Sequence, residues 1–202
     1  MPRPRNLIAA SAVALALLGG ASASAAPVFF DNFSQEALQL DAALDNWTVS
    51  DGTVDVVGTG FFAELCNGGP SADRCVDLDG STFNAGRITS NGISLGTGTY
   101  EFSFWARGNN RNAGPDTVRL GVETNVMPFT SLTLASTDGW QQFLYTFTLT
   151  APEVISLVFD HAGNDNMGIL LDNVAITQVP EPASLSLALL ALGSAFAARR
   201  RR

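Results

Sequence analysis

Alternation of apolar and polar side chains with a period of two is the feature that most constrains the fold of this chain. Residues 99–107 place Tyr, Phe, Phe and Ala on one side and Glu, Ser and Trp on the other. In residues 143–149 every odd position is apolar. Because successive side chains of a strand point to opposite faces, both segments predict half-buried β-strands.

Shorter segments predict further strands, and clusters of Gly, Asn, Asp and Pro that favour turns separate them. About ten strands in roughly 150 residues predict an all-β fold, with two antiparallel sheets packed as a sandwich. The expected strands are Phe29–Phe33, Trp47–Ser50, Val54–Val57, Cys75–Leu78, Arg87–Leu95, Thr99–Arg107, Asp116–Glu123, Trp140–Thr150, Val154–Phe159 and Ile169–Ile176.

Two segments between the strands are less regular. Residues 34–45 are compatible with one short helix that has Ser34 as its N-cap, and equally with a loop over one end of the sandwich. Residues 161–166 predict a turn between the last two strands, so we expect His161 to be structural.

The N-terminal residues 1–25 predict a secretory signal peptide. Arg3 and Arg5 precede an apolar core from Leu7 to Leu18, and Ala23-Ser24-Ala25 forms an A-x-A site. This order is typical of a signal helix that is removed after Ala25 during export. The folded β-sandwich domain is then expected over residues 26–178.

The C-terminal residues 179–202 contain three consecutive elements. Pro180-Glu181-Pro182 marks a boundary, since proline fixes φ and cannot continue a helix. The uncharged run Ala183–Ala198 predicts a hydrophobic helix of roughly 24 Å, just enough to span a membrane marginally. Arg199, Arg200, Arg201 and Arg202 would hold that end in the cytoplasm.

These three elements, in this order at the end of the chain, resemble the PEP-CTERM sorting signal of Gram-negative bacteria. The resemblance implies an inner-membrane-anchored precursor, processing by an exosortase-type enzyme near Pro180-Glu181-Pro182, and export together with exopolysaccharide. The product would lie at the cell surface or in the extracellular matrix. The alternative is a plain C-terminal anchor helix preceded by proline.

The charge of the exported part excludes one class of partner. The chain has 11 arginines, no lysine and 19 acidic residues. Leaving out Arg3, Arg5 and Arg199–Arg202 leaves five arginines against 19 acids in residues 26–182, a net charge of −14. Nucleic-acid binding requires a basic surface and is therefore excluded. Such an acidic domain suits an extracellular protein and is compatible with binding of divalent cations.

Cys66 and Cys75 are the two cysteines of the chain and enclose a loop-like segment rich in Gly, Pro and Asn. In an oxidising compartment they predict a disulfide that closes this loop. A ring of this size contributes roughly 2.5–3 kcal/mol in the chain-entropy model. A two-cysteine metal site, the alternative, lacks nearby Cys or His partners.

The domain also resembles carbohydrate-binding jelly rolls of the galactose-binding type. The resemblance rests on Asp31-Asn32-Phe33, Trp47-Thr48-Val49 and Leu171-Asp172-Asn173-Val174. Residues 75–82 resemble a stretch that recurs in exported PEP-CTERM proteins of that architecture. In such jelly rolls a structural calcium often joins the first strand to the last, which implies Asp31 and Asp172 as ligands. Asp77 or Asp79 could contribute, and the alternative is that these aspartates cap turns or face solvent.

A polar loop after the strongest strand is the candidate ligand site. Arg107, Asn109 and Arg111 offer planar, multi-point hydrogen bonding to sugar hydroxyls or carboxylates. Trp105 shares a strand face with Glu and Ser, so it could stack on a pyranose ring if that face is open. The expected ligand is exopolysaccharide.

No catalytic residues are predicted. Residues 92–96 match G-x-S-x-G around Ser94, but the nucleophile elbow needs a strand-to-helix turn, and here another strand follows. The favoured function is therefore a non-catalytic exported protein that binds exopolysaccharide. A structural or adhesive protein-binding module is the alternative. A hydrolase would need a cleft with two carboxylates, or Ser94 beside His161.

Overall fold

The computed structural model describes residues 25–71, 73–111, 113–124 and 126–180. The predicted signal helix and the predicted hydrophobic helix over Ala183–Ala198 lie outside these ranges. Across the ranges that are described, no helix combines the length and the apolar character needed to cross a membrane. The strands belong to one compact unit, Ser24–Pro180, which contains its own hydrophobic cores.

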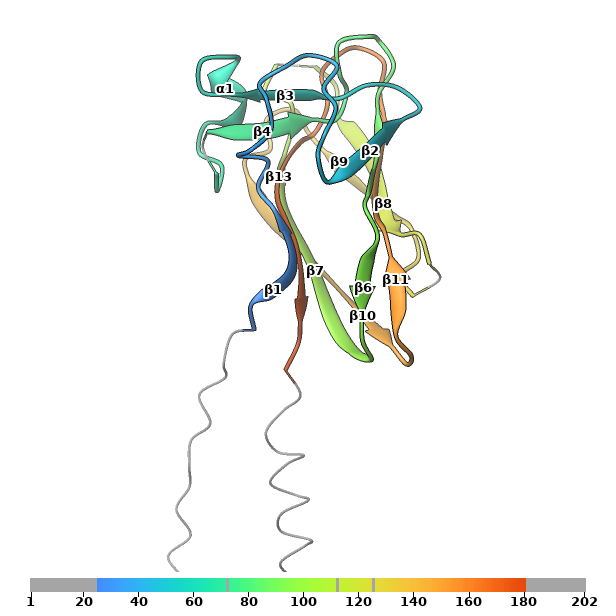
Figure 1. The fold of residues 1–202 in the computed structure, drawn as a ribbon. Coiled ribbons are helices and arrows are strands. Elements are labelled where there is room, and N and C mark those ends of the chain that lie inside the picture. Colours follow the sequence, from blue (N-terminus) through green and yellow to red (C-terminus); the bar gives the residue numbers. More distant parts are fainter. Residues whose placement is uncertain (1–24, 72, 112, 125, 181–202) are drawn as a thin grey trace, which may run out of the picture. The chain divides into compact units, whose positions relative to one another are not determined.

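Two antiparallel sheets face each other, as predicted for an all-β sandwich (Figure 1). The first sheet has the order β10-β7-β13-β4-β3, and β1 also pairs with β13. Its strands are β1 (Pro27–Asp31), β3 (Asp55–Gly58), β4 (Arg74–Asp77), β7 (Gly98–Arg107), β10 (Gln141–Leu149) and β13 (Leu170–Gln178).

The second sheet has the order β2-β5-β12-β8-β9, and a separate two-stranded ribbon pairs β6 with β11. A single short helix, α1 (Ala63–Cys66), is found among the described residues. The remaining strands are β2 (Trp47–Ser50), β5 (Arg87–Ser90), β6 (Ile93–Leu95), β8 (Asp116–Val122), β9 (Thr130–Leu134), β11 (Glu153–Ile155) and β12 (Leu157–Ala162).

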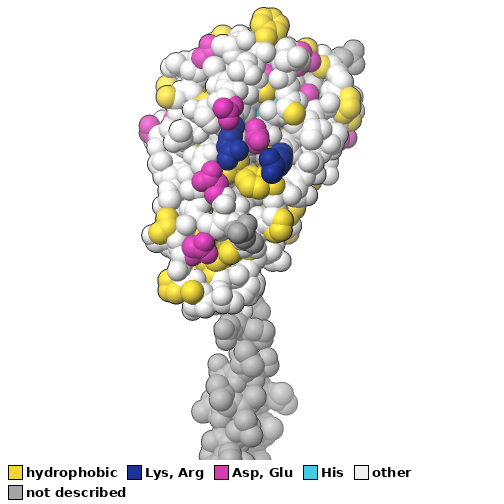
Figure 2. Space-filling view, turned by 90° about the vertical axis from the view of Figure 1, so that its right-hand side faces the viewer, with side chains coloured by type: hydrophobic (Ala, Val, Ile, Leu, Met, Phe, Trp, Pro, Cys, Tyr) yellow, Lys and Arg dark blue, Asp and Glu magenta, His cyan; other side chains and the backbone are white. Residues whose placement is uncertain are grey.

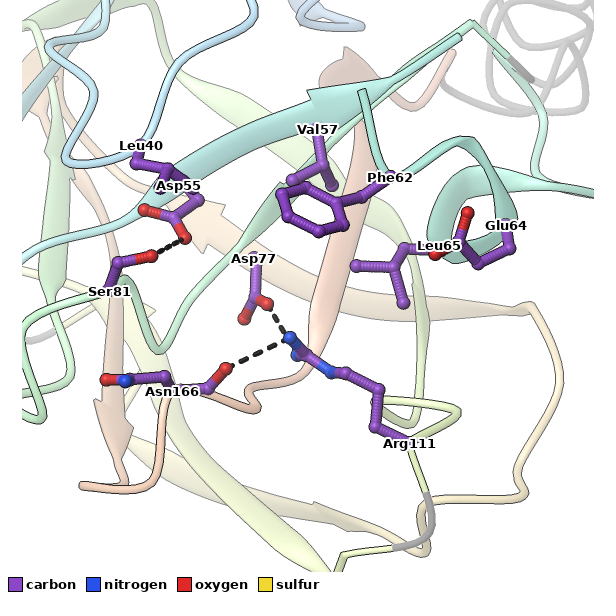
Figure 3. A pocket seen from close by; sticks show the side chains of 10 residues that line it. All are labelled: Leu40, Asp55, Val57, Phe62, Glu64, Leu65, Asp77, Ser81, Arg111 and Asn166. Atoms are coloured by element: carbon purple, nitrogen blue, oxygen red, sulfur yellow. Dashed lines mark hydrogen bonds and ion pairs between the residues drawn. The ribbon is translucent and has the colours of Figure 1, made fainter. Parts of the chain in front are cut away.

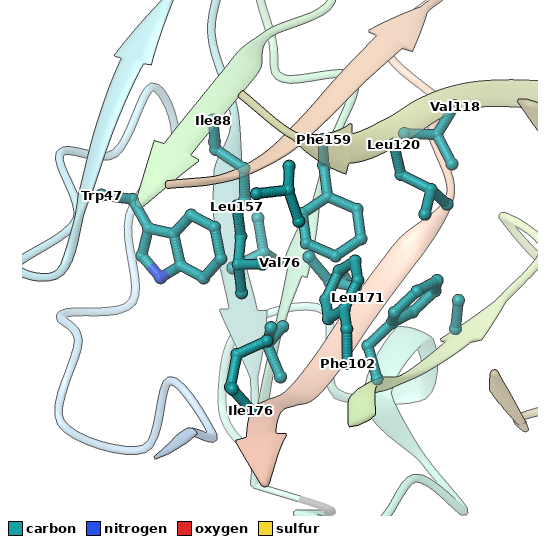
Figure 4. Close-up of a cluster of buried hydrophobic side chains, with 14 of the residues drawn as sticks. Trp47, Val76, Ile88, Phe102, Val118, Leu120, Leu157, Phe159, Leu171 and Ile176 are labelled. Carbon is teal, nitrogen blue, oxygen red and sulfur yellow. The ribbon is translucent and has the colours of Figure 1, made fainter. Parts of the chain in front are cut away.

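Aromatic rings from both sheets fill the space between them. Phe102 and Phe104 of β7 point inward and are fully buried, as their alternation predicted. Phe143 lies opposite Phe104 on β10, and their rings stack at 5.4 Å. Phe159 of β12 meets Phe104 edge-on at 5.0 Å from the other sheet, and Figure 4 shows it near the centre of this cluster. Such pairs add to the stabilisation that burial provides.

Strand β13 connects the two ends of the first sheet. Near its start Leu170 pairs with Asp77 of β4, and towards its end Thr177 pairs with Pro27 of β1. The first strand of the domain begins, and its last strand ends, at the same end of the sandwich. The other end carries β3, β4 and α1 (Figure 1).

A second apolar cluster lies on the side of the first sheet that faces away from the second sheet. Cys66 and Cys75 form the predicted disulfide within it, and both are buried. Residues 61–69 pack against this side of the sheet, because Trp140 and Arg107 donate hydrogen bonds to the carbonyl of Asn67. The cluster consists of Val57, Leu65, Cys66, Cys75 and Leu170, with Phe61 and Trp140 beside it.

Several details differ from the sequence prediction or resolve it. The predicted single strands Arg87–Leu95 and Val154–Phe159 are each divided, into β5 and β6 and into β11 and β12. Residues 34–45 form a loop, which makes isolated bridges such as Gln39 with Val56. His161 lies in β12 and not in the following turn, because its strand continues to pair with β8 up to Ala162. Strand β9 was missed, since its alternation contains only two apolar residues.

Candidate functional site

A pocket of about 220 Å³ opens at the end of the first sheet that carries β3, β4 and α1. Figure 3 shows its lining: side chains from β3 and β4 meet residues of α1 and of the loops that follow β1, β3, β4, β7 and β12. The pocket therefore exists only when segments far apart in the sequence fold together. It is lined by Leu40, Asp55, Val57, Phe62, Glu64, Leu65, Asp77, Ser81, Arg111 and Asn166.

An ion pair between Arg111 and Asp77 lies in this pocket. Nη2 of Arg111 is 2.5 Å from Oδ2 of Asp77, whose carboxylate is 1% exposed. Burial raises the pKa of Asp77 to about 7, against the lowering effect of Arg111 and of hydrogen bonds from the N–H groups of Asp79 and Gly168. The pair thus places a planar cation in a pocket whose neighbouring charges are acidic.

Asn109 positions the loop that carries Arg111. Its Oδ1 accepts a hydrogen bond from the Arg111 N–H at 2.7 Å, and its Nδ2 donates to Asp116 at 2.7 Å. The side chain is fully buried, so the prediction that Asn109 contacts a ligand is wrong. Both the oxygen and the nitrogen of its amide are hydrogen-bonded within the protein. The Arg111 side chain lines the pocket instead, and it donates a hydrogen bond to the carbonyl of Asn166.

Phe62 forms one wall of the pocket and is half-exposed. Its backbone is left-handed, with φ 56° and ψ 44°, at the residue that precedes α1. This conformation costs an L-residue with a Cβ roughly 1–2 kcal/mol, and glycine or asparagine adopts it more easily. Neither backbone preference nor burial in the core therefore explains a phenylalanine at this position.

The opposite wall is polar. Asp55 is buried, and its Oδ2 accepts a hydrogen bond from the Ser81 hydroxyl at 2.7 Å. Figure 3 shows Ser81 and Asn166 on the side of the pocket away from Phe62. The pocket therefore combines an apolar ring, a guanidinium, carboxylates, a hydroxyl and an amide.

The other two predicted ligand residues lie outside the pocket. Trp105 is half-buried on the outward side of β7, where Asp172 and Gln142 flank it across the strands. Arg107 donates a hydrogen bond to the carbonyl of Asn67 in the disulfide loop and lies over the Trp140 ring, and burial lowers its pKa. Arg111 is thus the one member of the predicted set that lines the pocket.

Asp31 and Asp172, the predicted calcium ligands on the first and last strands, accept hydrogen bonds from protein donors. Asp31 accepts the indole N–H of Trp47 at 2.9 Å and the backbone N–H of Phe33 at 2.8 Å. Asp172 accepts the Ser71 N–H at 3.0 Å, and burial raises its pKa to about 6. These aspartates tie loops to the first and last strands.

Asp77 and Asp79 belong to the β4 end of the sheet. Both oxygens of Asp77 have donors, whereas Oδ1 of Asp79 is buried without a hydrogen-bond partner among the described residues. Burial also raises the pKa of Asp79. Within the described ranges, no three His, Cys, Asp or Glu side chains are arranged to hold a metal ion. The four predicted aspartates therefore do not form a single site.

The residues considered for a hydrolase lie on separate strands. Ser94 is on β6 and pairs with Val154 of β11, so no strand-to-helix turn surrounds it. His161 is buried in β12, and its Nε2 accepts the Ile169 N–H at 3.3 Å. Burial lowers the pKa of His161 to about 4, which keeps the ring neutral near pH 7.

The outward face of the second sheet carries a separate row of charged and polar side chains. Figure 2 shows Arg and Asp or Glu side chains gathered on this side of the molecule. Arg87 bridges Glu123 at 3.1 Å and Asp160 at 3.8 Å, while Arg119 lies over the Phe129 ring at 4.5 Å. The row across the five strands is Ser50, Arg87, Asp160, Arg119 and Ser131.

Much of the pocket could not be located from the sequence. The missed residues come from the loop around Phe62, from Asp55 and Ser81, and from Asn166 in the loop before β13. The one available signal was the pair Phe61-Phe62 in a Gly-rich loop next to a cysteine.

The fold is that of carbohydrate-binding modules, whose jelly-roll domains are structural neighbours of this chain. The CBM22-1 xylan-binding domain of Xyn10C from Paenibacillus barcinonensis aligns with 80% of this chain and 100% of its own, at 13% identity and a TM-score of 0.50. TmCBM61, solved in complex with β-1,4-galactotriose, aligns with 73% of this chain and 94% of its own, at 18% identity and a TM-score of 0.50.

A third neighbour is the K3 adhesin domain of Lys-gingipain from Porphyromonas gingivalis w83. It aligns over 76% of this chain and 98% of its own, at 17% identity and a TM-score of 0.52. At these identities the similarity establishes the fold.

Residues 178–202 match the PEP-CTERM protein-sorting motif. The motif marks an exported protein that is sorted to the cell surface, as the sequence predicted. A search of curated proteins returned no match.

Proposed function

We propose that this protein is a non-catalytic, exported glycan-binding protein, and that the pocket beside α1 receives the glycan. The observation that carries the proposal is the meeting of Arg111, Asp77 and half-exposed Phe62 in one pocket. Sugar rings present apolar C–H faces and a rim of hydroxyls. An aromatic face beside planar donors and acceptors matches both parts.

The ion pair supports binding and argues against hydrolysis. Glycoside hydrolysis uses two carboxyl groups that are free to act as acid and as base or nucleophile. Asp77 is engaged by Arg111, and Asp55 accepts hydrogen bonds from Asp41 and Ser81. The two buried carboxylates of the pocket therefore orient protein donors and are not free for acid–base work.

The topology of β13 supports a role at the cell surface. The strand begins at Leu170, beside Asp77 of the pocket, and ends at Gln178, the residue at which the sorting motif begins. At about 3.3 Å per residue the strand separates the pocket from the C-terminal end of the domain by roughly 25 Å. We propose that an exosortase-type enzyme processes a membrane-held precursor near Pro180-Glu181-Pro182, while the pocket stays open to exopolysaccharide.

The experiment that tests this function is a binding screen with the exported domain, residues 26–178. Purified exopolysaccharide and an array of oligosaccharides are offered to the wild-type domain and to Phe62→Gly. The matched control is Phe30→Ala, since Phe30 is also 50% exposed but lies on β1 outside the pocket. Glycan retention that Phe62→Gly abolishes and Phe30→Ala preserves supports the proposal. Equal retention by all three domains contradicts it.

A second candidate function is adhesion to other proteins. Phe30 and Leu144 are exposed on the outward face of the first sheet, in one cross-strand row with Ala175 and Ser103. Exposed apolar side chains of this kind favour protein contacts. Phe30→Ser together with Leu144→Ser would then remove self-association or protein capture in sedimentation experiments, without affecting glycan retention.

We propose that calcium, if it binds to this domain, binds at Asp79. Calcium prefers oxygen ligands, and Oδ1 of Asp79 is a buried oxygen without a donor among the described residues. A bound ion would stabilise the folded domain, so added calcium should raise Tm and a chelator should lower it. An Asp79→Asn domain should not respond, and an unchanged Tm in the wild type would refute the site.

A further inference from the structure

Phe83 is a second exposed aromatic residue near the pocket. Its side chain is 68% exposed, the highest fraction among the large hydrophobic residues of the described ranges. It lies in the loop between β4 and β5, and its φ is 57°, again in the left-handed region. As with Phe62, neither core packing nor backbone preference accounts for an aromatic residue here.

The loop around Phe83 is firmly held. The carbonyl of Thr53 accepts the Gly80 N–H, and the Thr53 N–H donates to the carbonyl of Asn84, both at 3.0 Å. The hydroxyls of Thr53 and Thr82 are hydrogen-bonded at 2.8 Å. Bonds on both sides of Phe83 therefore fix the backbone that presents the ring, which lowers the entropic cost of ligand binding.

Contacts connect Phe83 to the pocket. Its N–H donates to Oδ1 of Asn166 at 2.6 Å, and the carbonyl of Asn166 accepts a hydrogen bond from Arg111 at 3.0 Å. Asn166 and Ser81, which line the pocket, lie on the side away from Phe62 in Figure 3. The backbone of Phe83 is thus attached to a residue of the polar wall, while Phe62 forms the apolar wall.

We infer that Phe62 and Phe83 are two aromatic contacts of one extended site, and that its ligand is a segment of a glycan chain with several sugar residues. The inference rests on the proposed function of the pocket. One exposed ring on the apolar wall and a second exposed ring next to the polar wall match a chain that extends beyond the pocket better than a single sugar inside it.

The charge of the pocket selects among glycan chains. Asp55, Glu64 and Asp77 line it, and Arg111 is the one cationic residue among the described residues of its lining. The domain around it is strongly acidic. Because like charges repel, a chain of uronic acids is disfavoured. The ligand class is therefore an uncharged glycan chain.

The test measures affinity as a function of chain length. Xylo-, cello- and β-1,4-galacto-oligosaccharides of one to six residues, and oligogalacturonates of the same lengths, are titrated by calorimetry into the domain of residues 26–178. Phe83→Ala should weaken binding of the longest neutral oligosaccharide about tenfold and binding of the shortest bound one less than about twofold. Phe83→Trp should keep the affinity, and Phe30→Ala is the control.

The outcomes distinguish a failure of the extended site from a failure of the proposed glycan binding by the pocket. If Phe62→Gly weakens binding while Phe83→Ala changes nothing at any length, the extended site is refuted and the proposed function stands. If neither variant has an effect, or no oligosaccharide binds, both are refuted. Tighter binding of oligogalacturonate than of neutral chains overturns the uncharged ligand class.

Discussion

Nη2 of Arg111 lies 2.5 Å from Oδ2 of Asp77, and this pair joins the loop after β7 to the buried end of β4. The Asp77 carboxylate is almost fully buried, while the Arg111 side chain is 27% exposed. Asp77 is therefore part of the buried interior next to β4, whereas Arg111 faces the pocket. The pair couples the stability of the domain to the geometry of its proposed binding surface.

Arg111→Ala should destabilise the domain in a pH-dependent way. The change leaves Asp77 buried without its cation, which typically costs 3–5 kcal/mol when the carboxylate is ionised. Burial already raises the pKa of Asp77 to about 7, and loss of Arg111 would raise it further. The cost should therefore be small at pH 5, where the carboxyl is protonated, and large at pH 8.

Urea unfolding of both proteins at pH 5 and pH 8 measures this difference. Arg119→Ala is the control, since Arg119 is exposed on the second sheet and contacts Phe129. That variant should lose less than about 1 kcal/mol, equally at both pH values. An Arg111→Ala cost that is the same at pH 5 and pH 8 would contradict the burial of an ionisable Asp77.

His161 should make the domain less stable as the pH falls. Burial lowers its pKa from 6.5 to about 4, so between these values the unfolded chain binds a proton that the folded chain does not. The loss reaches about 3 kcal/mol at pH 4. Over nearly the same range the raised pKa of Asp77 acts in the opposite direction, since its contribution is present at low pH and is lost as the pH rises through about 7.

The single histidine of the chain makes this prediction directly measurable. Its imidazole proton signals in the NMR spectrum of the folded domain should titrate with a midpoint near 4. His161→Gln, which keeps an acceptor for the Ile169 N–H, should flatten the acid side of the stability profile. A midpoint near 6.5 would show that the ring is open to solvent.

The disulfide should matter for both stability and binding. Replacement of Cys66 and Cys75 by alanine opens a ring that spans nine positions of sequence separation, which should cost roughly 2.5–3 kcal/mol of unfolding free energy. Because Phe62, Glu64 and Leu65 next to Cys66 line the pocket, the variant should also bind glycan more weakly. Thermal unfolding and calorimetry, with the reduced wild type as a second sample, check both effects. Unchanged affinity would show that the pocket wall holds its position without the bond.

The sequence predicted the sandwich better than the site, for a physical reason. Alternation in β7 and β10 reports directly which side chains are buried, so Phe102 and Phe104 could be placed in the core. The position of a loop depends instead on distant partners. Arg111 was found because planar cations are rare in this acidic domain, whereas Asn109 was assigned to the ligand although it supports the loop from inside.

The aromatic walls of the site illustrate the same limit. Trp105 was predicted to contact sugar on the basis of its strand face alone, and it lies outside the pocket. Phe62 and Phe83 have no periodic pattern around them, and both are exposed at left-handed positions in loops. No pattern of neighbouring residues in the sequence indicates such a conformation for phenylalanine.

Phe62→Gly should separate stability from function. The Phe62 ring packs edge-on against the Phe61 ring at 4.8 Å, and glycine removes this packing. Glycine also adopts the left-handed backbone at this position without the Cβ cost, and this gain offsets the weaker packing. We therefore expect the unfolding free energy to change by less than about 1 kcal/mol. Glycan affinity should nevertheless fall about tenfold or more, because the ring supplies the apolar face of the pocket.

Thermal unfolding and calorimetry on the same samples measure both quantities, with Phe30→Ala as the control of equal exposure. A ring that only stabilised the fold would lower Tm when removed and leave binding intact. A ring that serves the ligand gives the opposite result, and Phe62→Trp should then restore affinity. A lower Tm with unchanged binding would mean that Phe62 is retained for packing against Phe61, and the pocket beside α1 would lose its main argument as a glycan site.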